Sequence, residues 1–188
     1  MNVFDFDNTL YHGESVVDFA IFMLRHNKQI YTWLPTIFWY LMMYKLCLVT
    51  KEQMERKLNE FLKVLISDDY DLHTMVKAFW KENAHKLDPA MLRRIRPEDV
   101  ILTASPDFMM RVIGKRLGTT HILCSEVDIP TKTILYLNFG TNKVKRFRKL
   151  YKTTPVRRFY TDSYNDQAMI DLAQTAYLVE NGTVKRIK

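Results

Sequence analysis

The segment VFDFDNTL at residues 3–10 decides how the rest of the chain is interpreted. It has the form of a short apolar strand that ends in two carboxylates one residue apart. Side chains alternate along a strand, so Asp5 and Asp7 share one side before the chain turns into a loop. Neighbouring carboxylates repel each other unless a cation or a shared proton intervenes. The pattern indicates a Mg2+ site with Asp5 as a candidate nucleophile, and the alternative is a solvated turn after an edge strand.

The composition is that of one folded unit. Of the 188 residues, 47% are hydrophobic and 13% aromatic, which is enough for one good core with an inserted subdomain. Cys47 and Cys124 match no metal-binding spacing, so we expect free, buried thiols in a reducing compartment. Only Met1 and Asn2 precede the first strand. This leaves no room for a signal peptide, and we therefore expect a cytoplasmic protein.

The positive charge is unevenly distributed. The formal net charge is +7, and no acidic residue lies between Asp128 and Asp162. The same interval contains Lys132, Lys143, Lys145, Arg146, Arg148, Lys149, Lys152, Arg157 and Arg158. Such a run attracts phosphate esters, acidic lipid headgroups or nucleic acid, or forms a solvated helix face. No nucleic-acid recognition motif accompanies it, so we expect no nucleic-acid partner.

Residues 15–87 have helical patterns and no strand pattern. Ser15 followed by Asp18 resembles a capping box, and Thr50 followed by Gln53 resembles a second one. Apolar residues at helical spacing follow each of them. We therefore expect an all-helical insertion directly after the first strand.

Within this insertion, residues 30–49 carry a single charge, Lys45, and many aromatic side chains. The length of the segment is sufficient for a membrane span, but Pro35 interrupts it and the aromatics run through its middle. Three interpretations remain open. The segment is a spanning helix, an interfacial or partner-binding helix, or a buried helix of the insertion.

After Pro97, short apolar runs alternate with helical patterns. The runs lie at residues 100–102, 121–124, 133–137, 156–160 and 176–179, and the helical patterns at 106–117, 142–151 and 165–173. This alternation predicts an α/β fold with a doubly wound, parallel, Rossmann-like sheet. We expect residues 1–14 and 88–188 to form the α/β core and residues 15–87 a helical insertion.

Polar residues follow the predicted strands. TASP at residues 103–106 supplies hydroxyls and backbone N–H groups, which suit a phosphate. Lys143 opens the helical pattern after Gly140, and TDSYND at residues 161–166 supplies two more carboxylates. The carboxyl ends of parallel strands meet at one edge of a sheet, so these groups should gather around the first pair.

The motifs resemble those of the haloacid dehalogenase (HAD) superfamily of phosphohydrolases, in the subfamily (IB) that includes phosphoserine phosphatase. The family's first motif, Asp-x-Asp-x-Thr, matches DFDNT at residues 5–9, and its second, a hydroxyl that ends a strand, matches Thr103. The third, Gly-x-x-Lys-Val, matches residues 140–144. The fourth, a pair of acids, matches Asp162 and Asp166. The resemblance also implies a helical cap inserted after the first strand.

The resemblance implies a role for each matching residue. Asp5 would form an aspartyl-phosphate, and Asp7 would act as general acid and then general base. Mg2+ would bind Asp5, the backbone carbonyl of Asp7, and Asp162. Thr103, Lys143 and Asn8 would bind the phosphate, Asp166 and Thr9 would support the site, and Glu14 would contact substrate. Glu14 has an alternative interpretation as a helix N-terminal acid, and Lys145 is a rival for the role of Lys143.

The motifs favour phosphate esters, because Asp7 supplies an acid that a dehalogenase does not need. The resemblance departs from phosphoserine phosphatases at Thr161 and Ser163, where glycines are common, and at the ASP of residues 104–106. We expect a Mg2+-dependent phosphomonoester hydrolase for a small, phosphoserine-like metabolite. One alternative is a lipid phosphatase similar to the C-type phosphatidylglycerophosphatases, with its cap in peripheral contact with the inner face of a membrane. Another is a non-catalytic binding protein on the same scaffold.

Overall fold

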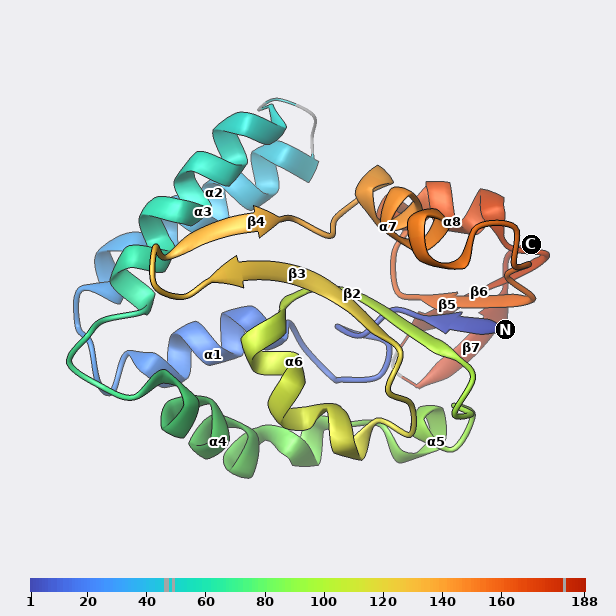
Figure 1. Ribbon diagram of the computed structural model, residues 1–188, viewed down its shortest axis with the longest axis horizontal. Coiled ribbons are helices and arrows are strands. Elements are labelled where there is room, and N and C mark those ends of the chain that lie inside the picture. The colour runs from blue at the N-terminus through green and yellow to red at the C-terminus, as the bar shows by residue number, and fades with distance from the viewer. Residues whose placement is uncertain (46–47, 49, 181) are drawn as a thin grey trace.

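The computed structural model describes residues 1–45, 48, 50–180 and 182–188 (Figure 1). Within them, one sheet of seven strands has the order β4-β3-β2-β1-β5-β6-β7. Its strands are β1 (Asn2–Phe4), β2 (Val100–Pro106), β3 (Ile122–Asp128), β4 (Thr133–Tyr136), β5 (Arg158–Thr161), β6 (Thr175–Glu180) and β7 (Thr183–Arg186). Strand β1, the start of the chain, therefore lies in the middle of the sheet.

The five central strands are parallel, so the predicted doubly wound α/β sheet is confirmed. Val3 of β1 lies opposite Val100 of β2 on one side and opposite Phe159 of β5 on the other. Strands β4 and β7 add antiparallel edges to β3 and β6. We did not predict β7, because Thr183–Arg186 is polar and lacks an apolar run. It becomes a strand through pairing with β6, which is a tertiary contact rather than a local preference.

The pleat divides the core between the two faces of the sheet. Val3 packs in a buried cluster with Phe147 and Met169, whereas the next residue, Phe4, belongs to a second cluster. Helices α7 (Thr141–Tyr151) and α8 (Gln167–Leu172) cover the first face. Helices α6 (Asp107–Ile113), α1 (Ser15–Met23), α4 (Leu72–Asn83) and α5 (Pro89–Leu92) lie toward the second (Figure 1). Short 3-10 turns at Ala84–Lys86, Gly114–Arg116 and Tyr164–Asp166 complete the helical elements.

The insertion after β1 is helical, as predicted. Besides α1 and α4 it contains α2 (Ile30–Lys45) and α3 (Lys51–Leu65), which stand beside β4 at one end of the molecule (Figure 1). Asn59 of α3 accepts a hydrogen bond from the backbone N–H of Ile134, at 2.7 Å, and Lys132 forms an ion pair with Asp68 at 2.9 Å. Contacts to the β3–β4 arm therefore support α3, far from the rest of the sheet.

The two predicted capping boxes have different outcomes. At α3 the box is confirmed, because Thr50 Oγ1 accepts from the N–H of Gln53 and Gln53 Oε1 accepts from the N–H of Thr50. At α1 it is wrong, because Glu14 occupies the cap position and Ser15 is already the first helical residue. The Ser15 side chain is fully buried and bonds to groups outside the helix.

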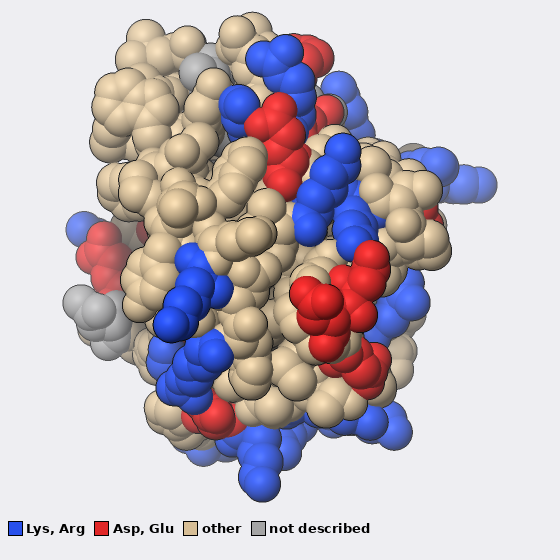
Figure 2. Space-filling model, turned by 90° about the vertical axis from the view of Figure 1, so that its left-hand side faces the viewer, with Lys and Arg blue, Asp and Glu red and all other residues tan. Residues whose placement is uncertain are grey.

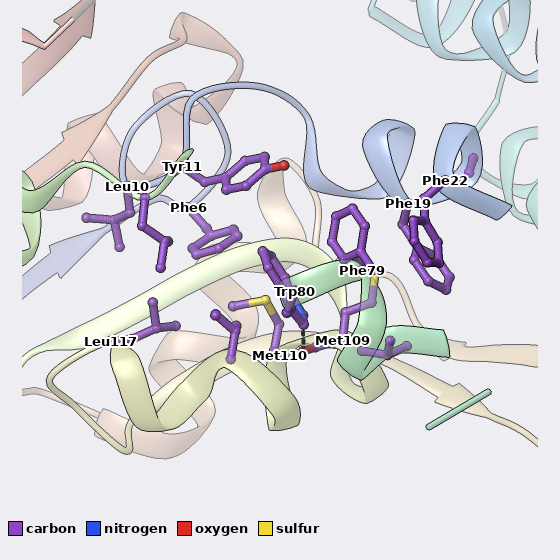
Figure 3. Close-up of a cluster of buried hydrophobic side chains, with 14 of the residues drawn as sticks. Phe6, Leu10, Tyr11, Phe19, Phe22, Phe79, Trp80, Met109, Met110 and Leu117 are labelled. Carbon is purple, nitrogen blue, oxygen red and sulfur yellow. Dashed lines mark hydrogen bonds between the residues drawn. The ribbon is translucent and has the colours of Figure 1, made fainter. Parts of the chain in front are cut away.

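An aromatic cluster joins the insertion to the loop that carries the first motif (Figure 3). Phe6, between the two motif carboxylates, stacks on Tyr11 with ring centroids 5.8 Å apart and meets the edge of Trp80 at 6.2 Å. Trp80 of α4 in turn donates to the backbone carbonyl of Met109 in α6 at 3.0 Å. Helices α1 and α4 thus share one buried cluster with the sheet. The division into a core at 1–14 and 88–188 and a cap at 15–87 stays a prediction.

The apolar segment at residues 30–49 forms α2 up to Lys45. Of the described residues, no helix combines the length and the apolar character required to cross a membrane. Residues 46, 47 and 49 lie outside the described residues, and so does the prediction of a free thiol at Cys47. Cys124 is a free thiol, as predicted, but it is only partly buried, whereas a buried thiol was expected.

Candidate active site

The site lies on the neighbouring strands β1, β2 and β5, at the carboxyl ends of β1 and β5 and within β2. Asp5 directly follows β1, and its backbone N–H donates to the carbonyl of Tyr160 in β5 at 2.8 Å. Thr103 lies in β2, and Asp162 directly follows β5. The chain proceeds from β1 to β2 and β3 on one side and returns to β5 on the other. The carboxyl ends of such neighbours frame a crevice, which is where ligands bind in open α/β sheets.

A buried ionic group occupies this edge. Lys143 Nζ lies 3.0 Å from Asp5 Oδ1 and 2.7 Å from Asp166 Oδ2. The three residues are only 3%, 8% and 5% exposed, respectively. Lys143 occupies the first turn of α7, and the turn before it has Gly140 at φ +55°, a conformation that favours glycine. The rival Lys145 is exposed, so the structure brings Lys143 and not Lys145 to the carboxylates.

The electrostatics of the group are dominated by burial. Burial raises the pKa of Asp5 well above its ordinary value, the Lys143 ammonium opposes this rise, and the Asp166 and Asp162 carboxylates add to it. For Lys143, burial lowers the pKa, but Asp5 and Asp166 outweigh burial and hold this pKa above its usual range. The lysine is therefore a permanent cation here. It favours the ionised form of Asp5 that a nucleophile requires.

Asp7 has a different environment, made of hydrogen-bond donors. Its Oδ1 accepts from the backbone N–H of Ser15 at 2.7 Å, and its Oδ2 accepts from the Ser105 hydroxyl at 2.8 Å. The two serine hydroxyls lie 2.8 Å from each other, so Ser15 and Ser105 enclose the carboxylate together. Burial raises the pKa of Asp7 to about 6, and the hydrogen bonds from both serines oppose the rise. Such a pKa suits a group that both gives and takes a proton near neutral pH.

Ser15 and Ser105 are the residues that sequence reasoning missed. Ser15 was assigned to a helix cap, and Ser105 was expected to offer its hydroxyl to a phosphate at a helix start. Instead Ser105 lies within β2, which continues to Pro106, and its backbone N–H donates to Thr103 Oγ1 at 3.0 Å. A signal was present, because Thr103 and Ser105 are two residues apart and so share one side of a strand.

The remaining residues predicted for the site lie around Asp5 and Asp7. Asn8 has φ +54° and donates its side-chain amide to Glu14 Oε1 at 3.0 Å. Burial raises the pKa of the Asp162 carboxyl group, and the amide of Asn8 opposes this rise. Thr9 is buried, and its hydroxyl has no hydrogen-bond partner among the described residues. The predicted contacts of Asn8 with phosphate and of Glu14 with substrate stay predictions, because here these two side chains bond to each other.

The carboxylates at this edge fit Mg2+. In the described part of the chain, no three His, Cys, Asp or Glu side chains form a metal cluster. Mg2+ does not need one, since it is commonly held by one or two carboxylates together with water and substrate phosphate. Asp162 raises the pKa of Asp5, which means that the two carboxylates repel each other when both are charged. A hard cation between the two carboxylates would relieve this repulsion. The predicted ligand set of Asp5, Asp162 and the Asp7 carbonyl stays a prediction.

Several solved structures have a similar fold. A protein of unknown function from Bordetella pertussis Tohama I has 18% identity and a TM-score of 0.77 and covers 94% of this chain and 87% of its own. A phosphoserine phosphohydrolase-like protein from Francisella tularensis subsp. tularensis SCHU S4 has 15% identity and a TM-score of 0.63, with coverages of 94% and 86%. A phospho-aspartyl intermediate analogue of phosphoserine phosphatase has 13% identity and a TM-score of 0.58, with coverages of 93% and 83%. At these identities the likeness establishes the fold.

The sequence itself establishes the family. No curated protein matches the chain significantly. However, the family model described as haloacid dehalogenase-like hydrolase matches residues 3–171, a range that contains Asp5, Thr103, Lys143 and Asp166. The chain therefore belongs to the haloacid dehalogenase-like hydrolases.

Proposed function

We propose that this chain is a Mg2+-dependent phosphomonoester hydrolase that acts, in the cytoplasm, on a small phosphorylated metabolite of the phosphoserine kind. The observation that carries the proposal is the buried group of Asp5, Lys143 and Asp166 with Asp7 beside it. An isolated structural turn does not explain a lysine that is buried between two carboxylates. Membership in a hydrolase family and fold neighbours named as phosphoserine phosphatases add support.

In the proposed reaction Asp5 is the nucleophile. Its Oδ1 already accepts from the Phe6 N–H at 2.9 Å and from Lys143, so we assign the attack on phosphorus to Oδ2. As the new bond forms, the bond between phosphorus and the leaving oxygen breaks, and that oxygen takes the proton of Asp7. Asp7 then accepts a proton from the water that attacks the aspartyl-phosphate, which releases phosphate and restores both carboxyl groups.

The other residues of the site would bind the phosphate and stabilise its negative charge. Lys143 neutralises charge on the phosphoryl oxygens, the Thr103 hydroxyl donates a hydrogen bond to one of them, and Asp166 holds Lys143 through the 2.7 Å contact. Thr161 fixes Asp166 in turn, since its hydroxyl donates to Asp166 Oδ2 at 3.2 Å. Mg2+ would supply charge neutralisation between the carboxylates and the phosphate. Most of the rate enhancement would come from this positioned charge.

A second candidate substrate is a lipid phosphate. The observation that favours it is the exposed apolar side of α2, where Phe38 is 70% exposed. A phosphatase that lies at a membrane surface meets phosphorylated headgroups at high local concentration. Parallel assays on phosphoserine and on phosphorylated glycerolipid in detergent micelles would rank the two substrate classes by kcat/KM.

The central test is hydrolysis of p-nitrophenyl phosphate with saturating Mg2+ in wild type, Asp5→Asn and Asp171→Asn. Asp171 is an exposed acid on α8, so its variant is a matched control for the charge change. We expect Asp5→Asn to lose activity by at least about a factor of 10³ and Asp171→Asn to keep it. Equal inertness of wild type and Asp5→Asn would contradict the proposal and favour the non-catalytic binding protein.

A further inference from the structure

Helix α2 is apolar on both its inner and its outer side. Trp33, Leu34 and Ile37 pack against the buried cluster, and the ring centroid of Trp33 lies 6.5 Å from that of Phe61 in α3. The other side exposes a row spaced by four, three, one and three residues, which is one face of a helix. The row consists of Tyr31, Pro35, Phe38, Trp39 and Met42. We call it the outer face of α2.

The exposure of the outer face is unusual for large side chains. Tyr31 is 61% exposed, Phe38 70% and Trp39 55%, and Leu48 just beyond the helix is 68% exposed. A helix that is apolar all round is normally buried in a core or in a membrane. Here no described part of the chain covers the outer face. Contiguous exposed apolar surface of this kind marks a partner or a membrane.

The charges around α2 indicate which occupant fits. Between Asp18 and Glu52 the sequence contains no acidic residue, and Lys28 precedes α2 while Lys45 and Lys51 lie at and after its end. Arg25, which also precedes α2, forms an ion pair with Glu82 at 2.8 Å. Lys28 is exposed directly before α2. Figure 2 views the end of the molecule at which α2, α3 and β4 lie in Figure 1, and its upper left is a broad area without charged side chains. Apolar surface flanked by cations is complementary to an anionic bilayer.

We propose that the outer face of α2 binds peripherally to the surface of an anionic lipid bilayer. Tyr and Trp side chains prefer the headgroup level of a membrane, which suits Tyr31 and Trp39. Pro35 has no N–H, so it cannot donate to the carbonyl of Tyr31 four residues earlier. That carbonyl needs water or headgroup donors, which are present at the interface and absent from the hydrocarbon. The helix would therefore lie shallow and parallel to the surface.

A second copy of the chain is a poorer occupant of the same face. Two outer faces placed against each other would bring their cation-flanked helices together, and like charges in an interface oppose association. A bilayer containing phosphatidylglycerol offers the opposite charge instead. The inference goes beyond the proposed function, because membrane binding requires no catalysis.

Vesicle co-sedimentation tests the inference with the full chain. We expect wild type to pellet with vesicles of equal parts phosphatidylcholine and phosphatidylglycerol at low salt, and much less with phosphatidylcholine alone. The double variant Phe38→Ser and Trp39→Ser should lose at least about tenfold in partitioning, because two large apolar side chains leave the contact. Leu150→Ser, which removes an exposed leucine from α7, should bind like wild type. Hydrolysis of p-nitrophenyl phosphate in solution should be the same in all three proteins.

Two further measurements decide between the occupants. Trp39 emission should shift to the blue when anionic vesicles are added, and the shift should disappear in Trp39→Phe. Light scattering after gel filtration gives the mass of each protein without lipid.

The inference would be overturned if wild type stayed in the supernatant after sedimentation with anionic vesicles, or if the double variant bound the vesicles as well as wild type. A dimer that dissociates in the double variant, without vesicle binding, would assign the face to a second copy. Loss of phosphatase activity alone would bear on the proposed function and leave the vesicle result intact.

Discussion

The edge of the sheet buries a charged side chain, Lys143, which is 3% exposed, and the outer face of α2 exposes an apolar one, Phe38, which is 70% exposed. Charged side chains are usually exposed and large apolar ones buried, so both regions reverse the usual placement. At the sheet edge, burial is tolerated because Asp5 and Asp166 pair with the lysine. At α2, no described residue pairs with the aromatic row. Buried charges require partners within the fold, whereas exposed apolar groups are stable without one. We therefore interpret the buried charges at the sheet edge as a sign of catalysis and the exposed apolar face of α2 as a sign of an external partner.

The largest expected effect comes from breaking the buried pairing with Lys143→Met. The variant leaves Asp5 and Asp166 buried without a cation, and we expect the free energy of unfolding to fall by about 3–5 kcal/mol. Unpaired buried carboxylates favour their protonated form, so the deficit should shrink as the pH falls. Urea unfolding at several pH values measures this, with exposed Lys145→Met as the control. A deficit that is independent of pH would contradict the electrostatic explanation.

Metal removal should have the next largest effect, on activity rather than on the fold. We expect chelation with EDTA to abolish phosphatase activity and Mg2+ to restore it, and Mg2+ to raise the unfolding temperature of wild type. Asp162→Asn should shift the midpoint of the Mg2+ titration by at least about tenfold, because one carboxylate ligand is lost. Asp171→Asn is again the matched control. An unchanged midpoint in Asp162→Asn would remove Asp162 from the predicted ligand set.

A smaller and more selective effect is expected for Ser105→Ala. The variant deletes the 2.8 Å hydrogen bond that orients Asp7, without removing the acid itself. Hydrolysis of an alkyl phosphate, which needs a proton donor, should fall by about 10- to 100-fold. Hydrolysis of p-nitrophenyl phosphate should fall less, because its leaving group is more acidic. Ser105→Thr keeps a hydroxyl and should recover part of the loss. An equal loss on both substrates would indicate a structural role alone.

The smallest effect is expected at the outer face of α2. Phe38→Ser should change the free energy of unfolding by no more than about 0.5 kcal/mol, because the side chain contacts mainly solvent. Phe79→Ala, in the fully buried aromatic cluster, should cost about 3–5 kcal/mol. Thermal unfolding of the two variants side by side measures the contrast. A large destabilisation by Phe38→Ser would mean that the outer face is covered within the folded chain.

Much of the fold could be predicted because local patterns carried it. Alternating apolar runs predicted the parallel sheet, and they also predicted that Asp5, Thr103 and Asp162 lie in or directly after three neighbouring strands. The prediction that Thr103 ends its strand was wrong, because β2 continues to Pro106. The capping box at Thr50 was predictable because all of its bonds are local. Strand β7 was not, because a polar segment becomes a strand only when a neighbour offers its edge. The capping box predicted at Ser15 was wrong for a similar reason, because the hydroxyl of Ser15 bonds to Ser105, a residue ninety positions away in the chain.

By itself, the sequence determined the family, the order of the motifs and the chemistry that each of them can perform. Asp5, Asp7 and Lys143 were identifiable as candidates because spacing and residue type are properties of the chain. Only the tertiary structure decided that Lys143 rather than Lys145 meets the carboxylates, that two serines enclose Asp7, and that α2 leaves one face uncovered. These are matters of burial and of contacts between distant segments, and local periodicity does not specify which neighbour a side chain meets.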